Sequence, residues 1–301
     1  MKFLITGGTG LIGTRLSKVL IDSGHSVNIL TRKIKKQDNS SLKYFIWNTS
    51  NKSVDSKCID GVNVIINLAG SSVFSIWTKS NKKRIINSRL DSLSIIYDLM
   101  KRKKHNVKRI ISASAIGIYP NDQSKVYFEN SNKISGTFLG NVVSEWELKA
   151  KIFNKINIDL SIVRIGLVLS ENGGILKKLL QLNNFRFSSI IDDGNQWQSW
   201  IHIDDLVNIF LYISLNNING VINGVSPNPV TFKKLQSNIS SNYKKPFLSL
   251  NFSKSLFTTI LSLLGMSDFY FDMIGSNKRV SSKKIQDLGY KFVYPSLDKL
   301  K

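Results

Sequence analysis

The sequence is poor in cysteine and has no long apolar run. Cys58 is the only cysteine among 301 residues, so no internal disulfide is possible and a reducing, cytoplasmic environment is expected. No stretch of 18 or more apolar residues occurs, which argues against a membrane-spanning helix. The longest candidate, 255–265, is short enough to predict a buried or interfacial helix. The first residues enter a strand pattern at once, without the basic segment of a signal peptide.

Acidic residues are also few. The chain has 42 Lys and Arg against 20 Asp and Glu, which gives a formal net charge of +22. Such a balance can indicate nucleic acid or an anionic membrane as partner. The basic residues are spread along the chain, however, and the densest cluster, 101–109, contains no aromatic residue for base stacking. We therefore expect neither nucleic acid nor a membrane as partner. The positive electrostatic field of the protein should still favour small anionic ligands.

Histidine is scarce, which limits metal chemistry. His202 lies near Asp204 and Asp205, but His25 and His105 are far away in the sequence and no ligand-spaced cluster appears. We predict no metal site. Asp204 is better interpreted as the N-cap of the helix pattern that follows it.

The first half of the chain alternates strand and helix patterns. Continuous apolar runs occur at 2–6, 26–30, 62–70, 109–114 and 160–166, and most are separated by helical spacing. Apolar strands separated by helices are typical of a parallel sheet that is covered on both faces. The pattern therefore predicts an α/β fold with a Rossmann-type, doubly wound parallel sheet.

The second half has a looser pattern, with helical segments separated by Gly, Pro and Asn. Short strands are expected only around 220–225 and 291–295. We predict a Rossmann domain over 1–225, in which 167–200 contributes to the substrate side. A smaller, mainly helical C-terminal lobe is predicted over 226–301.

Three glycines follow the first strand pattern and precede the first helix pattern. Gly7, Gly10 and Gly13 lie in TGGTGLIG, the context that the dinucleotide-binding fingerprint requires. Glycine allows a tight turn and a close backbone approach, and the helix N-terminus offers free N–H groups to a pyrophosphate. The segment therefore predicts a bound dinucleotide.

The end of the second strand indicates which dinucleotide. NAD-binding proteins commonly place Asp or Glu there, where it accepts hydrogen bonds from the ribose. This sequence has Thr31, Arg32 and Lys33 instead. A guanidinium can bind a phosphate through two hydrogen bonds, so Arg32 favours NADP(H).

Seven motifs, taken in order, resemble one known group. They are TGGTGLIG (6–13), NLAG (67–70), SASAIGIY (112–119), WE (146–147), RIGLVLSENGG (164–174), QWQSWIHIDDLV (196–207) and NGVSPNPV (223–230). Together they resemble the NAD-dependent, epimerase-like branch of the short-chain dehydrogenase/reductase superfamily. Its members are often labelled nucleoside-diphosphate-sugar epimerase or cell-division-inhibitor-like. The resemblance includes a family-specific C-terminal part near 250–298.

The resemblance implies a set of NADP(H) contacts. They fall on Gly7, Thr9, Gly10, Leu11, Ile12, Gly13, Thr31, Arg32, Leu68, Ala69 and Arg89. The segment 183–197 departs from the family, because it keeps only Gly194 where relatives are rich in glycine. That segment is expected to face the substrate, so a substrate cannot be carried over from relatives.

The superfamily's usual proton donor is missing. Its members use a tyrosine whose pKa falls beside a lysine four positions later, and a serine that orients the substrate oxygen. Ser114 is our candidate for that serine. Tyr97 and Lys101 have the right spacing but precede Ser114, and the apolar pattern around Tyr97 predicts core packing. The expected segment, 138–153, contains no tyrosine.

Two replacements for the proton donor are open. Tyr119 lies just beyond Ser114, and Glu145 or Glu147 could act as acid or base if burial raised its pKa. We name Ser114 and Tyr119 as the catalytic candidates. Trp197 and Trp200 either line the substrate pocket or simply pack.

The sequence supports two hypotheses about function. The first is an NADP(H)-dependent oxidoreductase or epimerase that acts on a small polar molecule, with nucleotide sugars as one candidate class. The second is a non-catalytic NADP(H)-binding sensor. The missing tyrosine–lysine pair favours the second, and the cofactor loop is neutral between them.

Overall fold

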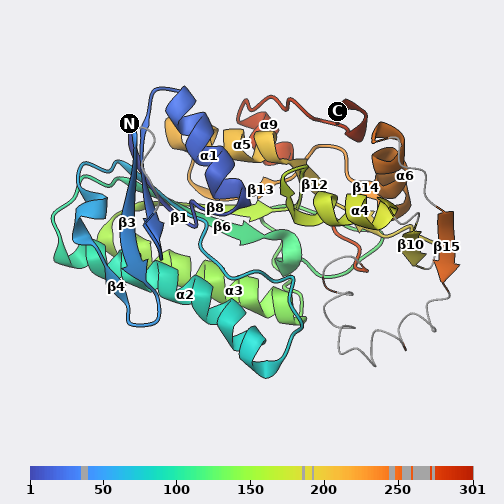
Figure 1. Cartoon of the computed structure of the whole chain (residues 1–301), viewed down its shortest axis with the longest axis horizontal. Coiled ribbons are helices and arrows are strands. Elements are labelled where there is room, and N and C mark those ends of the chain that lie inside the picture. Colours follow the sequence, from blue (N-terminus) through green and yellow to red (C-terminus); the bar gives the residue numbers. More distant parts are fainter. Residues whose placement is uncertain are drawn as a thin grey trace.

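A computed structural model describes residues 1–34, 40–184, 187–191, 193–243, 248–252, 259, 272 and 275–300. Its centre is an eight-stranded sheet (Figure 1). The strands are β1 (Lys2–Thr6), β2 (Ser26–Thr31), β3 (Leu42–Asn48), β4 (Ser53–Val54), β5 (Val64–Asn67), β6 (Arg109–Ala115), β8 (Asp159–Ile165) and β13 (Gly220–Gly224).

The strand order is β13-β8-β6-β5-β1-β2-β3-β4, and only the β3–β4 pair is antiparallel. β1 pairs with β2 on one side and with β5 on the other, so Ile5 lies between Ile29 and Ile66. The order of connections reverses between β1 and β5. Ligands of such sheets bind outside the carboxyl ends of the strands at this switch point.

Helices cover both faces of the sheet, as Figure 1 shows. α1 (Leu11–Asp22) and α5 (Ile203–Leu215) pack together on one face, and α2 (Lys79–Arg102) and α3 (Phe138–Ala150) pack together on the other. Apolar strand residues such as Phe3, Leu4 and Ile5 are fully buried between these layers. The doubly wound α/β prediction is confirmed.

Beyond β8, short strand pairs and helices surround a second apolar core that contains Leu169 and Trp200. The helices of this core are α4 (Gly174–Asn184) and α6 (Phe232–Asn242), while the short α9 (Lys283–Asp287) packs on the main core through Ile285. The strand pairs are β9 (Leu167–Ser170) with β12 (Trp200–His202), β10 (Phe187–Ile191) with β15 (Leu248–Phe252), and β11 (Trp197–Gln198) with β14 (Val230–Thr231). A further pair, β7 (Val126–Tyr127) with β16 (Arg279–Val280), contributes Tyr127 and Val280 to a separate small cluster.

Two strand predictions for this half have different outcomes. The strand expected at 220–225 is β13, and it completes the main sheet beside β8. The strand expected at 291–295 is wrong, because the backbone there binds a side chain and not another strand. The N–H groups of Val293 and Tyr294 donate to the buried carboxylate of Asp205, at 2.9 and 2.8 Å. The division at residue 225 stays a prediction.

Several expectations lie outside the described residues. Most of the helix predicted at 255–265 does so, as does much of the family-specific part near 250–298. In the described ranges, no helix is long and apolar enough to cross a bilayer.

The single cysteine lies in a short 3-10 helix, η1 (Ser56–Ile59), beneath the sheet edge. Its side chain is fully buried. Burial raises the pKa of the Cys58 thiol to about 12, and the nearby Asp55 carboxylate adds to the effect. The thiolate is therefore rare at neutral pH, and Cys58 acts as an apolar core residue.

Candidate functional site: a glycine loop and a buried ionic network

The glycine loop joins β1 to α1 at the switch point. Gly7 has φ +68°, and a Cβ at this position would lie 2.7 Å from the Leu68 carbonyl oxygen. A Cβ at Gly13 would overlap the Gly7 carbonyl oxygen, so α1 packs directly on the loop. Gly10 closes the turn by donating its N–H to that carbonyl, at 3.0 Å. These contacts leave no room for a side chain at Gly7 or Gly13, so both positions require glycine.

The N-terminus of α1 differs from those of four other helices. Helices α2, α3, α5 and α6 each begin with a side-chain cap, supplied by Thr78, Thr137, His202 and Thr231. Helix α1 begins after Gly10, with no side-chain cap and no acidic residue in its first turn. Its free N–H groups and the positive end of its dipole therefore suit an external anion. A dinucleotide pyrophosphate fits this position.

The chain bends directly after β2, and the Arg32 side chain is exposed there. Thr31 is buried, and its hydroxyl donates to the Lys33 carbonyl at 2.9 Å, which bends the chain after the strand. Arg32 is exposed at this bend and forms no ion pair within the described ranges. A guanidinium that is exposed at the end of the strand beside β1 is accessible to a phosphate.

Arg89 reaches the end of β5 from α2. Its guanidinium lies 5.0 Å from the centre of the Trp146 ring and beside Gly70, and its Nη1 donates to the carbonyls of Ile85 and Ser71 at 2.8 and 3.3 Å. Burial lowers the pKa of Arg89 to about 10. No carboxylate pairs with Arg89 within the described ranges. An anionic ligand beside it would offset the cost of its burial.

Leu68 and Ala69 directly follow β5, the strand beside β1. The Ala69 N–H donates to the Thr6 hydroxyl at 3.2 Å, and that hydroxyl donates to the Asn67 side chain at 2.7 Å. These bonds tie the end of β5 to the end of β1 immediately before the glycine loop. The structure thus brings the cofactor candidates from three strand ends to one edge of the sheet.

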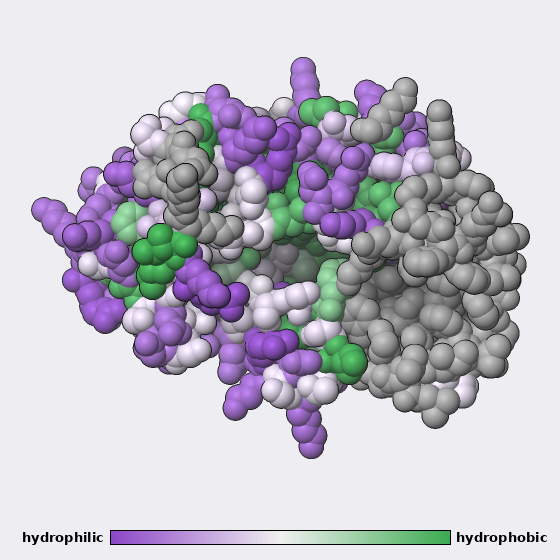
Figure 2. All heavy atoms as spheres, viewed as in Figure 1, coloured by the Kyte–Doolittle hydropathy of each residue, from purple (hydrophilic) through white to green (hydrophobic). Residues whose placement is uncertain are grey.

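The surface near these strand ends contains a hollow and a cleft. Figure 2 shows a hollow near the centre, over the place where Figure 1 draws the ends of β6 and β8 below α1. A cleft of about 740 Å³ also borders the glycine loop. It is lined by Thr9, Gly10 and Leu11 on one side and by the turn at 170–173 and the start of α5 on the other. Its volume is within the range of small-molecule sites.

Ser114 lies at the carboxyl end of β6, next to a buried ion pair. Its hydroxyl donates to Glu147 Oε1 at 2.6 Å. Both carboxylate oxygens of Glu147 accept from Arg164, Oε1 from Nε and Oε2 from Nη2, each at 2.8 Å. All three residues are at most 7% exposed. Burial would lower the pKa of Arg164, but its bonds to Glu147 and Tyr119 raise it overall.

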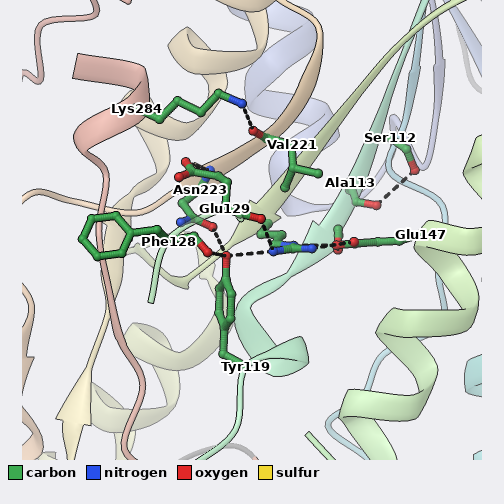
Figure 3. A network of polar contacts seen from close by, with 11 residues as sticks. Ser112, Ala113, Tyr119, Phe128, Glu129, Glu147, Val221, Asn223 and Lys284 are labelled. Carbon is green, nitrogen blue, oxygen red and sulfur yellow. Dashed lines mark hydrogen bonds and ion pairs between the residues drawn. The ribbon is translucent and has the colours of Figure 1, made fainter. Parts of the chain in front are cut away.

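Tyr119 completes this network from the opposite side. Arg164 Nη1 donates to the Tyr119 hydroxyl at 2.9 Å, and the hydroxyl lies 2.7 Å from Asn223 Oδ1 and 3.2 Å from the Phe128 carbonyl. Arg164 thus links the Tyr119 hydroxyl to the Glu147 carboxylate, and Figure 3 labels Tyr119 and Glu147 within this network of polar contacts. Tyr119 is fully buried, and burial raises its pKa. This is the opposite of the shift that an acid at neutral pH needs.

The other proton-donor candidates lie elsewhere. Glu145 is exposed on α3. Tyr97 packs edge-on against Phe153, with ring centres 5.8 Å apart, and Lys101 lies over its outer face at 5.9 Å. The core-packing prediction for Tyr97 is therefore confirmed.

The interpretation of Asp204 as a helix cap is wrong. His202 caps α5, because its Nδ1 accepts from the Asp204 N–H at 3.3 Å. The Asp204 carboxylate instead pairs with Arg15 of α1 at 2.6 Å. Within the described ranges, no three His, Cys, Asp or Glu residues are grouped as metal ligands would be.

The two tryptophans also differ. Trp200 is fully buried, and its indole N–H donates to the Asn228 carbonyl at 2.9 Å, so it packs. Trp197 is half-buried, with the Arg279 guanidinium 4.6 Å from its ring centre.

Arg164 and Asn223 are members of the network that the sequence did not predict. Arg164 interrupts an apolar run that becomes β8, and a charged residue in a strand buried on both faces requires a partner. A charged residue within an apolar strand therefore predicts a buried ion pair, but it does not identify the partner of Arg164.

Lys278 is a third residue that the sequence did not single out. Its side chain is 7% exposed, and its ammonium donates to the Tyr119 backbone carbonyl. No carboxylate lies within ion-pair distance of it in the described ranges. Burial lowers the pKa of Lys278 to about 8, against an opposing effect of Asp272.

Lys278→Met is expected to stabilise the protein at neutral pH. The folded pKa of about 8 lies below the ordinary 10.5, so the folded state releases its proton at lower pH than the unfolded state. The charged lysine therefore costs up to about 3 kcal/mol below pH 8, and the cost disappears as pH rises to the unfolded value. Urea unfolding of both proteins from pH 7 to 10.5 measures this. A stability difference that is independent of pH would contradict it.

The fold and the loop at its switch point define the class, a Rossmann-type nucleotide-binding protein. A sequence model of the NAD dependent epimerase/dehydratase family matches residues 3–224, so the chain belongs to that family. This agrees with the resemblance to epimerase-like short-chain dehydrogenases/reductases.

Full-length relatives are similar. Epimerase family protein SSP1921 of Staphylococcus saprophyticus is 33% identical, over 98% of this chain and 96% of the relative. Epimerase family protein YfhF of Bacillus subtilis is 29% identical, over 99% and 96%.

Two solved structures are also similar. Human epimerase family protein SDR39U1, solved with NADPH, has a TM-score of 0.83 at 23% identity and covers 99% of this chain and 97% of its own. A nucleoside-diphosphate sugar epimerase from Corynebacterium glutamicum has a TM-score of 0.76 at 26% identity, over 99% of this chain and 56% of its own. Family and fold agree.

Proposed function

We propose that the protein is an NADP(H)-dependent oxidoreductase or epimerase that acts on a small polar substrate, with nucleotide sugars as one candidate class. The observation that carries the proposal is the uncapped N-terminus of α1 behind a loop that requires glycine at Gly7 and Gly13. When bound, the coenzyme supplies hydride chemistry. The human relative was solved with NADPH, which supports the choice of coenzyme.

The proposed coenzyme contacts follow the strand ends. Gly7, Thr9, Gly10, Leu11, Ile12 and Gly13 hold the pyrophosphate, Thr31 and Arg32 hold the 2′-phosphate, and Leu68, Ala69 and Arg89 line the end of β5. Arg32 and Arg89 suit this role because neither has a carboxylate partner within the described ranges.

Within the proposed site, Ser114 contacts the substrate oxygen. The sequence makes Tyr119 a candidate for the proton donor, but its hydroxyl is buried among Arg164, Asn223 and the Phe128 carbonyl. We therefore propose that Tyr119 positions Arg164, and that a water carries the proton to or from the substrate.

Arg32→Ala tests the coenzyme. NADPH affinity is expected to fall by about 10- to 150-fold, which corresponds to the loss of charge-assisted hydrogen bonds worth about 1.5–3 kcal/mol. NADH affinity should hardly change, because NADH lacks the 2′-phosphate. Calorimetric titration of both coenzymes measures this, with Lys33→Ala as the neighbouring control. Equal losses for the two coenzymes would remove the phosphate assignment.

A non-catalytic NADP(H)-binding sensor is the second candidate. The observation that favours it is the raised pKa of a fully buried Tyr119, where the superfamily needs an accessible acid. Incubation with NADPH and a panel of carbonyl compounds and nucleotide sugars, and with NADP⁺ and the corresponding alcohols, separates the two. Turnover that disappears in Ser114→Ala, with NADPH affinity unchanged, supports the enzyme. Tight NADPH binding without turnover of any compound supports the sensor.

A further inference from the structure

The hydroxyl hydrogen of Ser114 has a defined destination. Glu147 Oε1, 2.6 Å away, also accepts from Arg164 Nε, while Oε2 accepts from Arg164 Nη2. A carboxylate held by both arms of a guanidinium is ionised and can only accept. The short contact with Ser114 therefore requires that the serine donates. Ser114 has a single hydroxyl hydrogen, and that hydrogen points to Glu147.

The hydroxyls of Ser112 and Tyr119 also donate their hydrogens to acceptors within the protein. Ser112 donates to the Ala113 carbonyl at 3.1 Å. The Tyr119 hydroxyl accepts from Arg164, so its hydrogen is left for Asn223 Oδ1 at 2.7 Å or the Phe128 carbonyl at 3.2 Å. The hydroxyls of Ser112, Ser114 and Tyr119 thus all direct their hydrogens to protein acceptors. None of these three hydrogens remains for a substrate carbonyl.

We infer that Ser114 offers only lone pairs to a ligand, and that the group which docks on it is therefore a hydroxyl and not a carbonyl. The substrate class is then an alcohol, bound in its reduced form. The inference rests on the proposed function only in placing a ligand at the carboxyl end of β6. It reverses the usual role of this serine, which donates to a carbonyl oxygen in enzymes that keep the tyrosine and lysine.

Glu147 is a positioning residue in this arrangement. It contacts Ser114 from α3 and fixes the direction of the serine hydrogen, while Arg164 of β8 keeps the carboxylate ionised and in place. A ligand hydroxyl can donate a hydrogen bond to Ser114 Oγ. A ligand carbonyl cannot, so its oxygen and Ser114 Oγ would face each other without a hydrogen bond. That difference is the source of the expected selectivity.

Neutron diffraction from deuterium-exchanged crystals of the full chain tests the polarity directly. Deuterium on Ser114 Oγ is expected on the line to Glu147 Oε1. Deuterium directed toward the hollow would overturn the inference. This measurement needs no substrate, and its outcome is independent of whether the protein binds NADP(H), which calorimetry reports separately.

Ligand-observed NMR tests the selectivity. Cyclohexanol and cyclohexanone, which differ only in the oxygen function, are added in competition to the protein saturated with NADP⁺. The alcohol is expected to give at least a threefold larger saturation-transfer signal. The preference should disappear in Ser114→Ala and persist in Ser114→Thr, which keeps the hydroxyl. A larger signal for the ketone, or an equal preference in wild type and Ser114→Ala, would overturn the inference.

A further variant separates the positioning role of Glu147 from a purely structural one. In Glu147→Gln the amide can donate, so the Ser114 hydrogen is no longer confined to one direction. The ratio of alcohol to ketone signals is expected to fall toward one. Circular dichroism and NADPH affinity verify that the variant is folded. A folded variant that keeps the full ratio would overturn the role given to Glu147.

Discussion

Replacing Arg164 with methionine is expected to lower the free energy of unfolding by about 3–5 kcal/mol. The guanidinium donates two hydrogen bonds to Glu147 and one to the Tyr119 hydroxyl. Without it, the Glu147 carboxylate remains 7% exposed and lacks a countercharge in the described ranges. An unpaired buried charge is costly, because neither water nor another cation replaces the lost partner. Urea unfolding followed by circular dichroism measures the change.

Two control variants test whether the loss of stability comes from the unpaired buried charge. The double variant Arg164→Met/Glu147→Met removes both charges and is expected to recover most of the loss, since a buried pair is often replaceable by apolar residues. Arg15→Met breaks the Arg15–Asp204 pair, whose side chains are 38% and 25% exposed, and should cost less than about 1 kcal/mol. Equal losses in Arg15→Met and Arg164→Met would contradict the importance of burial.

Gly7→Ala is expected to have the second large effect. Its φ of +68° is unfavourable for alanine, and the new Cβ would lie 2.7 Å from the Leu68 carbonyl oxygen and 2.8 Å from its carbon. Backbone atoms cannot move away as a flexible side chain can, so the loop must distort. We expect a loss of more than about 3 kcal/mol of stability and no measurable binding of NADPH. Thermal unfolding and calorimetry measure both.

Gly24 provides a matched control for the backbone conformation. It has φ +78°, but nothing lies within 4 Å of a Cβ built there. Gly24→Ala should therefore cost only the conformational penalty, about 1–2 kcal/mol, and leave NADPH affinity unchanged. Equal losses of stability in Gly7→Ala and Gly24→Ala would contradict a destabilising clash between the new Cβ and Leu68.

Sequence pattern was sufficient for the sheet and for the glycine loop. Both rest on local signals: apolar runs for strands such as β1 and β6, and a glycine spacing that follows a strand and opens a helix. The paired short strands beyond β8 were not foreseen. Elements of two residues, such as β11 and β14, are too short to show any periodicity.

The buried network could not be predicted for a different reason. Its members are Ser114, Tyr119, Glu147, Arg164 and Asn223, which come from separate elements. Ser114 lies opposite Arg164 in the β6–β8 register, and Asn223 lies opposite Arg164 in the β13–β8 register. Those registers are set by tertiary packing, which a single sequence does not reveal. The hydrogen-bond partners of Tyr119 were equally out of reach, because its direction depends on the turn η2 (Ile116–Ile118) that precedes it.

The inert thiol of Cys58 makes the protein convenient for site-directed chemistry. Because the only native sulfhydryl is sealed in the core and protonated at neutral pH, maleimide reagents will leave the wild-type chain unmodified. A cysteine introduced at an exposed position would be the sole reactive handle, with no need for a cysteine-free background. Fluorophores or spin labels attached there could then report loop movements as nucleotide is added.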